Sequence, residues 1–181
     1  SQWSLTDRRR FLRSVWSGVG ASVSLALLPG RELLAAPKVG ANPFTLGIAS
    51  GDPTDDGIVL WTRLAPVPAE PESLGQNVIP VRWRVAKDAG MHQVMASGIA
   101  AAHPALAHSV HVEVRGLRPA QDYFYQFSVR GEESAIGHFR TAPREHEVLR
   151  QLRFAFVTCQ DWPSGYYTAY RDMLRSDLDL V

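Results

Sequence analysis

The feature that most constrains the fold is a series of short runs in which apolar and polar residues alternate, separated by turn-forming residues. The clearest run has Val81, Trp83 and Val85 in phase, with arginines at the positions between them. Such alternation predicts an antiparallel strand with one face buried and the other in water. The segment 42–143 is therefore predicted to be a domain built mainly of β-strands. Its expected strands cover residues 44–49, 58–63, 81–86, 93–101, 109–114 and 134–141.

The sequence around Tyr123 indicates which β architecture these strands form. Leu117 and Pro119 lead through a turn into Tyr123, which is the spacing of a tyrosine corner, where the phenol hydroxyl bonds back to the backbone. This spacing resembles a fibronectin type III module, so Tyr123 is predicted to be structural. Tyr125 and Phe127 are expected in the core. Roughly seven short strands at this spacing favour an immunoglobulin-like or fibronectin type III-like sandwich.

Two groups of polar residues in this domain raise the question of a metal site. Residues 50–57 form a turn with three aspartates, but their spacing does not fit the alternate-ligand pattern of an EF-hand loop. A solvated acidic turn explains them better, because aspartates are ordinary turn residues. His108 and His111 are three positions apart, so on a strand they point to opposite faces. Both are predicted to be surface or edge residues.

Residues 1–41 have the three-part pattern of an export signal. Arginines at positions 8–10 precede a moderately apolar stretch, and small residues follow before a possible cleavage point after Ala41. The apolar stretch is too short and too weakly apolar to span a bilayer. The basic string resembles the twin-arginine export motif, with Arg8 and Arg9 as the pair. The resemblance implies the twin-arginine machinery as a partner and a periplasmic or secreted location; the alternative is a basic amphipathic helix.

The character of the chain changes after a polar linker at residues 144–151. Residues 154–157 are continuously apolar, which is typical of a strand buried on both faces of a parallel sheet. A helical pattern follows, and a second apolar strand is expected at residues 178–181. Residues 152–181 are therefore predicted to be the first βα unit of an α/β domain.

Cys159 is the only cysteine, and it follows that apolar run just before Pro163 and Gly165 exclude a continuing strand. It is thus expected at the carboxyl end of a strand, where open α/β sheets place their ligands. As a nucleophile it needs a histidine base, and as a metal ligand it needs further donors; neither lies nearby in sequence. Residue chemistry leaves three roles open: nucleophile, metal ligand or small buried apolar residue.

Three motifs around Cys159 resemble the opening of the catalytic domain of PhoD-like alkaline phosphatases, which are metallophosphoesterases. That family reads F-A-x-x-S-C-Q, G-Y-x-T-A-Y-R and D-L-D-L-V; this chain has FAFVTCQ, GYYTAYR and DLDLV, with Thr158 replacing the commoner serine. Residues 42–47 and 58–66 are similar to the start of the family's N-terminal domain. The resemblance implies that Cys159 is a ligand of ferric iron, that calcium also belongs to the site, and that phosphomonoesters and phosphodiesters are substrates.

Both ends of the sequence look cut, so the chain is expected to be a fragment of such an enzyme. The remaining metal ligands are expected beyond Val181, and the fragment alone is expected to be inactive. The alternative is a non-catalytic exported β-sandwich that acts as a binding or spacer module. A net charge of +1 gives no case for a nucleic-acid-binding surface. A single cysteine cannot form an internal disulfide.

Overall fold

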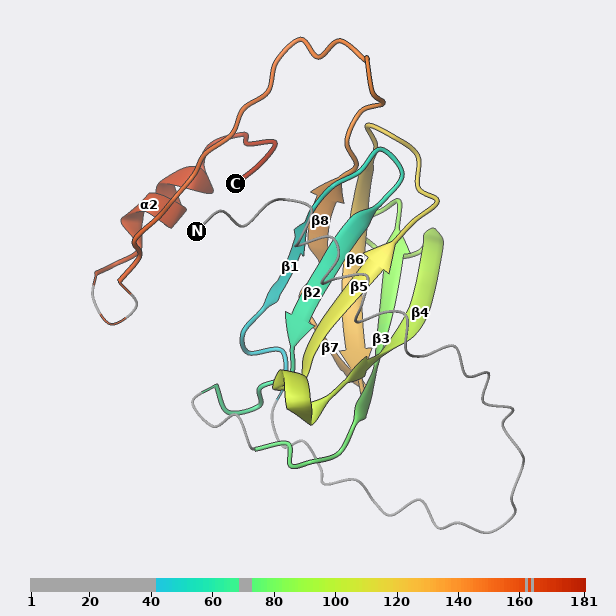
Figure 1. The fold of residues 1–181 in the computed structure, drawn as a ribbon, viewed down its shortest axis with the longest axis vertical. Coiled ribbons are helices and arrows are strands. Elements are labelled where there is room, and N and C mark those ends of the chain that lie inside the picture. Colours follow the sequence, from blue (N-terminus) through green and yellow to red (C-terminus); the bar gives the residue numbers. More distant parts are fainter. Residues whose placement is uncertain (1–41, 69–72, 162, 164) are drawn as a thin grey trace, which may run out of the picture. The chain divides into compact units, whose positions relative to one another are not determined.

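The computed structural model shows two antiparallel β-sheets over residues 42–143, followed by a C-terminal segment whose described part holds one short α-helix (Figure 1). All described residues lie in a compact unit of residues 39–181, and they are residues 42–68, 73–161, 163 and 165–181. The predicted mainly β sandwich is confirmed. The predicted export signal, with Arg8 and Arg9, lies outside the described residues.

The strands are divided between a small and a larger sheet. The first has the order β1-β2-β5, and its strands are β1 (Ile48–Gly51), β2 (Ile58–Arg63) and β5 (Ser109–Val114). The second has the order β4-β3-β6-β7 with β8 also paired to β6, and its strands are β3 (Ile79–Ala86), β4 (Val94–Ala102), β6 (Asp122–Val129), β7 (Glu132–Glu133) and β8 (Gly137–Arg140). A short 3-10 helix, η1 (Pro104–Leu106), connects β4 to β5. Every pairing between these strands is antiparallel.

The alternation in the sequence decides which side chains fill the space between the sheets. Ile58 and Leu60 of β2 are buried, as are Tyr123, Tyr125 and Phe127 of β6. Because successive strand residues point to opposite faces, one register places the whole apolar set inside. Each fully buried large apolar side chain contributes about 1.5–3 kcal/mol. The interior of the sandwich is therefore the main source of its stability.

The predicted tyrosine corner is confirmed. The backbone N–H of Arg118 donates a hydrogen bond to the Tyr123 hydroxyl at 2.9 Å. Beside it, the buried Thr141 hydroxyl donates to the Arg118 carbonyl at 2.6 Å and accepts from the Gln121 N–H at 3.0 Å. The Tyr123 ring stacks on Phe139, with centroids 5.5 Å apart. These contacts fix the turn before β6 onto β8 and the residues that follow it.

Most strand bounds lie within two residues of the sequence prediction, but two strands begin three or four residues later than predicted. β1 begins at Ile48 and not at position 44, because Gly47 has φ of 75° and its N–H donates to the Phe44 carbonyl at 3.0 Å, closing a turn. The strand expected at 134–141 is shorter: β8 starts at Gly137, while the Ser134 hydroxyl accepts from the Phe127 N–H at 3.0 Å. In both places a local turn or side-chain bond replaces ladder pairing.

No helix in the described part of the chain is long and apolar enough to cross a membrane.

Candidate functional site

The segment that contains Cys159 begins and ends with two stretches that run side by side in parallel. Phe154 and Leu180 form an isolated parallel β-bridge, and the Ala155 N–H donates to the Leu180 carbonyl at 3.1 Å. The helix α2 (Thr168–Met173) lies between them in sequence. Parallel neighbours need a crossover connection, which is usually a helix. The predicted order of strand, helix and strand is therefore present in outline.

Arg153 holds the two stretches together at one end. Its guanidinium pairs with the Asp177 carboxylate at 2.6 Å, and its N–H donates to the Asp179 carboxylate at 2.9 Å. The Asp179 N–H in turn donates to the Arg153 carbonyl at 2.8 Å. The DLDLV motif thus supplies carboxylates for this local anchor, and its Leu180 supplies the bridge.

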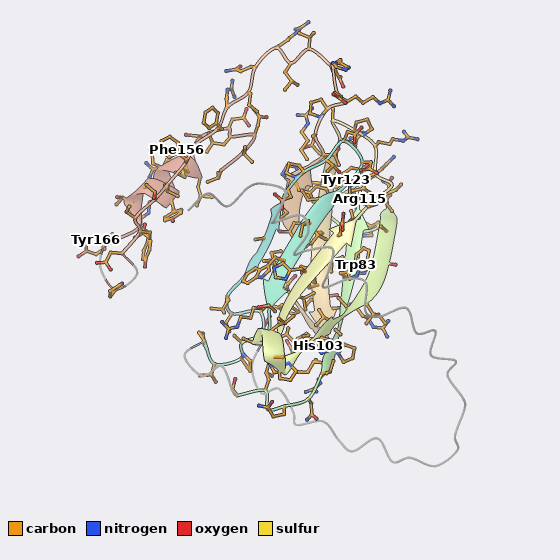
Figure 2. All side chains as sticks on the ribbon, in the orientation of Figure 1. Trp83, His103, Arg115, Tyr123, Phe156 and Tyr166 are labelled. Carbon is orange, nitrogen blue, oxygen red and sulfur yellow. The ribbon has the colours of Figure 1, made fainter. Side chains whose placement is uncertain are left out.

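The prediction that residues 154–157 form a strand buried on both faces is wrong for this chain. Phe154 is 62% exposed and Phe156 is 80% exposed, and a single bridge replaces the strand. Tyr166 and Leu174 are each 87% exposed as well; Figure 2 labels Phe156 and Tyr166 in this segment. The physical reason is that a parallel strand is buried only when neighbouring strands and helices cover both faces. The described residues supply one bridging partner.

Cys159 itself is exposed and follows the bridged stretch directly. It has φ of 57°, in the left-handed region that non-glycine residues adopt rarely, so the chain turns sharply there. The Thr158 hydroxyl lies 3.5 Å from its sulfur. An exposed thiol does not fit the role of a small buried apolar residue. The predicted position at the turn after the first apolar stretch is thus present, while the role of the thiol stays a prediction.

The partners that the other two roles of Cys159 require are not found beside it. In the part of the chain that the structure describes, the thiol is within hydrogen-bond distance of Thr158 and of no histidine, so a Cys–His nucleophile pair has no support there. The described residues also contain no group of three or more His, Cys, Asp or Glu side chains able to hold a metal ion. Among the described residues, Cys159 is therefore not part of a donor group large enough to hold a metal ion.

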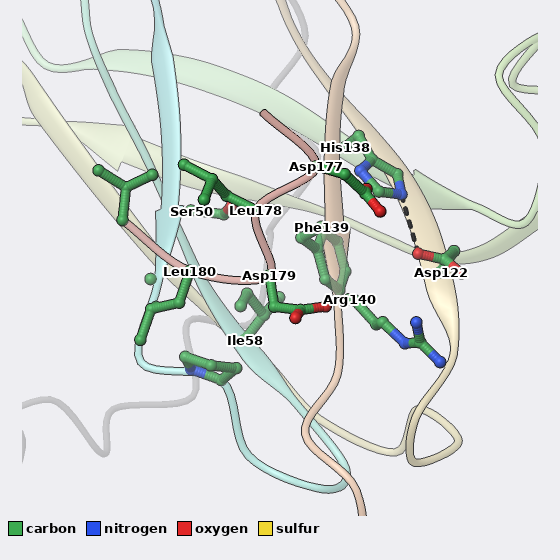
Figure 3. A pocket seen from close by; sticks show the side chains of 13 residues that line it. Ser50, Ile58, Asp122, His138, Phe139, Arg140, Asp177, Leu178, Asp179 and Leu180 are labelled. Atoms are coloured by element: carbon green, nitrogen blue, oxygen red, sulfur yellow. Dashed lines mark hydrogen bonds and ion pairs between the residues drawn. The ribbon is translucent and has the colours of Figure 1, made fainter. Parts of the chain in front are cut away.

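A histidine–carboxylate pair lies on the sandwich, at a pocket that Ser50 and Gly51 of β1 help to line. His138 of β8 contacts Asp122 of β6 through Nε2 at 3.0 Å (Figure 3). The two strands are hydrogen-bonded neighbours, and both side chains are about half exposed. His138 also lies against the Phe124 ring. Cross-strand packing explains this pair without a catalytic role.

The acidic turn between β1 and β2 is the solvated turn that the sequence predicts. The Arg115 guanidinium pairs with Asp56 at 3.2 Å and also with Glu113. The Thr54 hydroxyl and Arg115 lower the pKa of Asp56 below its ordinary value, and Glu113 and Asp56 raise the pKa of Arg115. These charges satisfy one another at the surface.

The prediction that His108 is a surface or edge residue is wrong, whereas His111 is exposed as expected. His108 is 2% exposed, with φ of 56°, and its Nε2 donates to the Asn77 carbonyl at 3.0 Å. Asn77 lies 31 positions earlier in sequence, so no local pattern could reveal this contact. Because the ring bonds a backbone carbonyl, His108 fastens a loop to the start of β5.

Comparison with known proteins decides the family. The profile described as "PhoD-like phosphatase, N-terminal domain" matches residues 31–143. The chain belongs to the PhoD-like phosphatase family. The matched residues include the whole sandwich, so the sandwich is the N-terminal domain of that family.

Two relatives match more of the chain than the profile does, and the alignment with the first includes the Cys159 segment. Alkaline phosphatase D of Bacillus subtilis (strain 168) is 43% identical over 178 residues, which is 97% of the PhoD-like chain and 30% of that protein. The solved structure of PhoD matches with a TM-score of 0.77 and 45% identity, over 80% of this chain and 28% of that one. The chain therefore spans about 30% of the length of the relative that it matches.

Proposed function

We propose that this PhoD-like chain is the N-terminal part of an exported, metal-dependent phosphatase that hydrolyses phosphomonoesters and phosphodiesters. The observation that carries the proposal is the 43% identity to alkaline phosphatase D over 97% of the chain, since that alignment includes the segment around Cys159 as well as the sandwich. A module used only for adhesion has no need of a βα unit. The alternative, a non-catalytic exported binding or spacer sandwich, is favoured by one observation: the core cluster lies wholly between Phe44 and Phe139.

Ferric iron together with calcium is the metal complement that we propose for the longer polypeptide. The exposed sulfur of Cys159 fits iron, which accepts sulfur ligands, and suits calcium poorly, because calcium prefers oxygen ligands. Cys159 would hold the iron, which when bound supplies Lewis-acid activation of the phosphate ester. The described residues fit only one position of such a site, since they form no group of three or more donors.

The first prediction concerns Cys159 in a polypeptide extended to the length of its relative. We expect Cys159→Ser to lose iron and phosphatase activity while staying soluble, because a hydroxyl is a far weaker iron ligand than a thiolate. Thr158→Ser, which restores the commoner family residue beside it, should keep both. Iron content, thiolate-to-iron absorption and hydrolysis of nitrophenyl phosphate mono- and diesters measure these effects.

The same assays separate the two functions. If Cys159→Ser keeps its iron and its absorption spectrum, the thiol is not a ligand. If the extended polypeptide hydrolyses neither ester, the result favours the alternative function, a non-catalytic binding or spacer sandwich. The 181-residue chain assayed alone is expected to bind iron below stoichiometry and to hydrolyse neither ester; turnover by this chain would contradict the incomplete donor set.

Export through the twin-arginine route is the second prediction, and it rests on the sequence alone. Replacing Arg8 and Arg9 together by lysine should keep the protein in the cytoplasm, because the machinery reads the arginine pair as an address. Arg10→Lys is the matched control and should leave export intact. Cell fractionation followed by immunoblotting measures the distribution. Equal export of the double variant and the control would show that the pair is not the signal.

A further inference from the structure

The strand β4 (Val94–Ala102) presents a long free edge on the larger sheet. β4 is nine residues long and stands last in the order β4-β3-β6. Among the described strands it pairs only with β3, from Ala86 opposite Val94 to Ile79 opposite Ala102. A strand with one neighbour leaves a row of N–H and C=O groups on its other side without ladder partners. Nine residues make that row roughly 30 Å long.

This edge has little of what usually prevents strand addition. β4 contains no Lys, Arg, Asp, Glu or Pro, and its one protective feature is a register shift at its first residues. The edges elsewhere in the described sandwich are different. β1 and β8 have four residues each, β7 has two, and β5 carries His111 and Glu113. Short or charged edges resist pairing with another chain, and a long uncharged one favours it.

Most of the exposed side chains on β4 are apolar, and Ser97 is the exposed polar one. Ile99 is 64% exposed, Met95 50% and Val94 44%. Ile99 stands opposite Arg82 of β3 on the outer face of the sheet, where Pro80, Arg82 and Ile99 help to line a shallow pocket. A neighbouring strand laid along β4 would therefore gain backbone hydrogen bonds and cover these apolar side chains.

We propose that β4 is an interaction surface that pairs antiparallel with β4 of a second copy of this chain. A twofold axis makes such pairing possible, because each copy offers the same patch to the other. Centred on Gly98, the pairing sets Ser97 opposite Ile99 of the partner and Ala96 opposite its Ala100. The strand can pair with a copy of itself without repulsion, because none of its nine residues is charged and no two like charges would face each other.

The flanking charges are compatible with this pairing. Arg82 is the nearest cation to Ile99 on the outer face of the sheet. In the dimer Ile99 would stand opposite Ser97 of the other copy, so Arg82 of one copy and Arg84 of the other would lie three strand spacings apart, about 14 Å. That separation exceeds the Debye length of about 8 Å at physiological ionic strength, so their repulsion is screened.

The third prediction tests this surface with the 181-residue chain. We expect a concentration-dependent dimer by sedimentation equilibrium, and we expect Ile99→Lys to weaken its dissociation constant by roughly tenfold or more. The reason is that the dimer would then contain two lysines, one from each copy, beside the paired β4 strands, and their like charges repel. Because Ile99 projects into solvent, the variant should fold as the parent does, which near-ultraviolet circular dichroism checks. His111→Lys, at an exposed position of the other sheet, is the matched control and should dimerise unchanged.

A second variant tests the register. In a Cys159→Ser background, Ser97→Cys combined with Ile99→Cys places each new thiol opposite the other in the dimer. Opposed residues of an antiparallel pair lie about 4.5–5.5 Å apart at Cα, within disulfide range. Oxidation should therefore link two chains, whereas His111→Cys in the same background should not link.

Several outcomes would overturn the proposal. A chain that stays monomeric at every concentration has no such interface. If the Ile99→Lys variant still associates, or if the 97/99 double-cysteine variant forms no disulfide between chains, then the association uses another surface. The exposed apolar residues Phe156 and Leu174 are one such surface. Dissociation by Ile99→Lys together with the expected disulfide would establish both the surface and its register.

Discussion

Tyr123 and Tyr125 are two positions apart on β6, face the same core and are held differently. The Tyr123 hydroxyl accepts a hydrogen bond from the Arg118 N–H at 2.9 Å. Tyr125 is 3% exposed; burial raises its pKa above the ordinary value, and a hydrogen bond with Ser50 lowers it in part. Its ring occupies the space beside Gly137, where an added Cβ would stand 2.3 Å from a ring carbon. Tyr123 thus fixes a turn, whereas Tyr125 fixes the close packing of β8.

The fourth prediction follows from the corner. Tyr123→Phe keeps the ring that stacks on Phe139 but leaves the Arg118 N–H without its acceptor. A partly buried donor that loses its partner costs about 1–2 kcal/mol. The free energy of unfolding from urea denaturation should fall by that amount, with an unchanged slope.

Tyr166→Phe is the matched control for this substitution. Tyr166 is 87% exposed, so the loss of its hydroxyl should leave stability unchanged within about 0.5 kcal/mol. Equal stability of the two variants would show that the Arg118 bond contributes nothing net and that water replaces it.

The contrast between Tyr123 and His108 shows what single residues reveal in a sequence. The corner is readable because its donor lies five positions from Tyr123, on the turn that the Leu-x-Pro spacing marks. His108, which is predicted at the surface or an edge, is instead buried, and its ring bonds a carbonyl 31 positions away. Contacts within one turn could be predicted here, and contacts between distant loops could not.

At the scale of elements, the predictions held where one face of a strand is buried. β2 and β5 have the predicted bounds, since their alternation leaves one register that buries the apolar set. β1 starts later than predicted because Gly47 closes a turn, and the Ala65 N–H donates to the Pro43 carbonyl at 2.7 Å, outside the ladder. Such local backbone hydrogen bonds do not alter the hydropathy pattern of the sequence, so that pattern could not predict them.

In the candidate site, by contrast, the strands predicted from the sequence are mostly not formed. The apolar run before Cys159 and the DLDLV motif predicted two parallel strands, and the structure has one bridge between Phe154 and Leu180. A parallel strand is buried only when other strands and helices cover it, so an apolar run by itself does not form a buried strand. The position of Cys159 after the first stretch could be predicted, but its ligand role depends on donors that the described residues do not bring together.

At the scale of the whole molecule, the described residues form one part with its own hydrophobic core, residues 42–143, and one part without, the residues after 143. Every member of the core cluster lies between Phe44 and Phe139, and no described residue after Thr141 is buried. The hydrogen bonds of Arg153 run to Asp177 and Asp179, within the C-terminal segment. Stability against local opening should therefore be high in the sandwich and low after residue 143, because few buried contacts oppose opening there.

The fifth prediction is that limited trypsin digestion cuts first at Arg144, Arg150 or Arg153 and leaves residues 42–143 intact. The first two are exposed and lie outside the strands, whereas Arg82 and Arg84 belong to β3, which pairs on both sides. A protease needs an extended, locally open backbone, and a central strand offers one only on unfolding. Intact-mass spectrometry over time identifies the first cut, and Arg150→Gln should remove one product without slowing the others. Early cleavage within β3, or uniform resistance along the chain, would show that the two parts do not differ in stability.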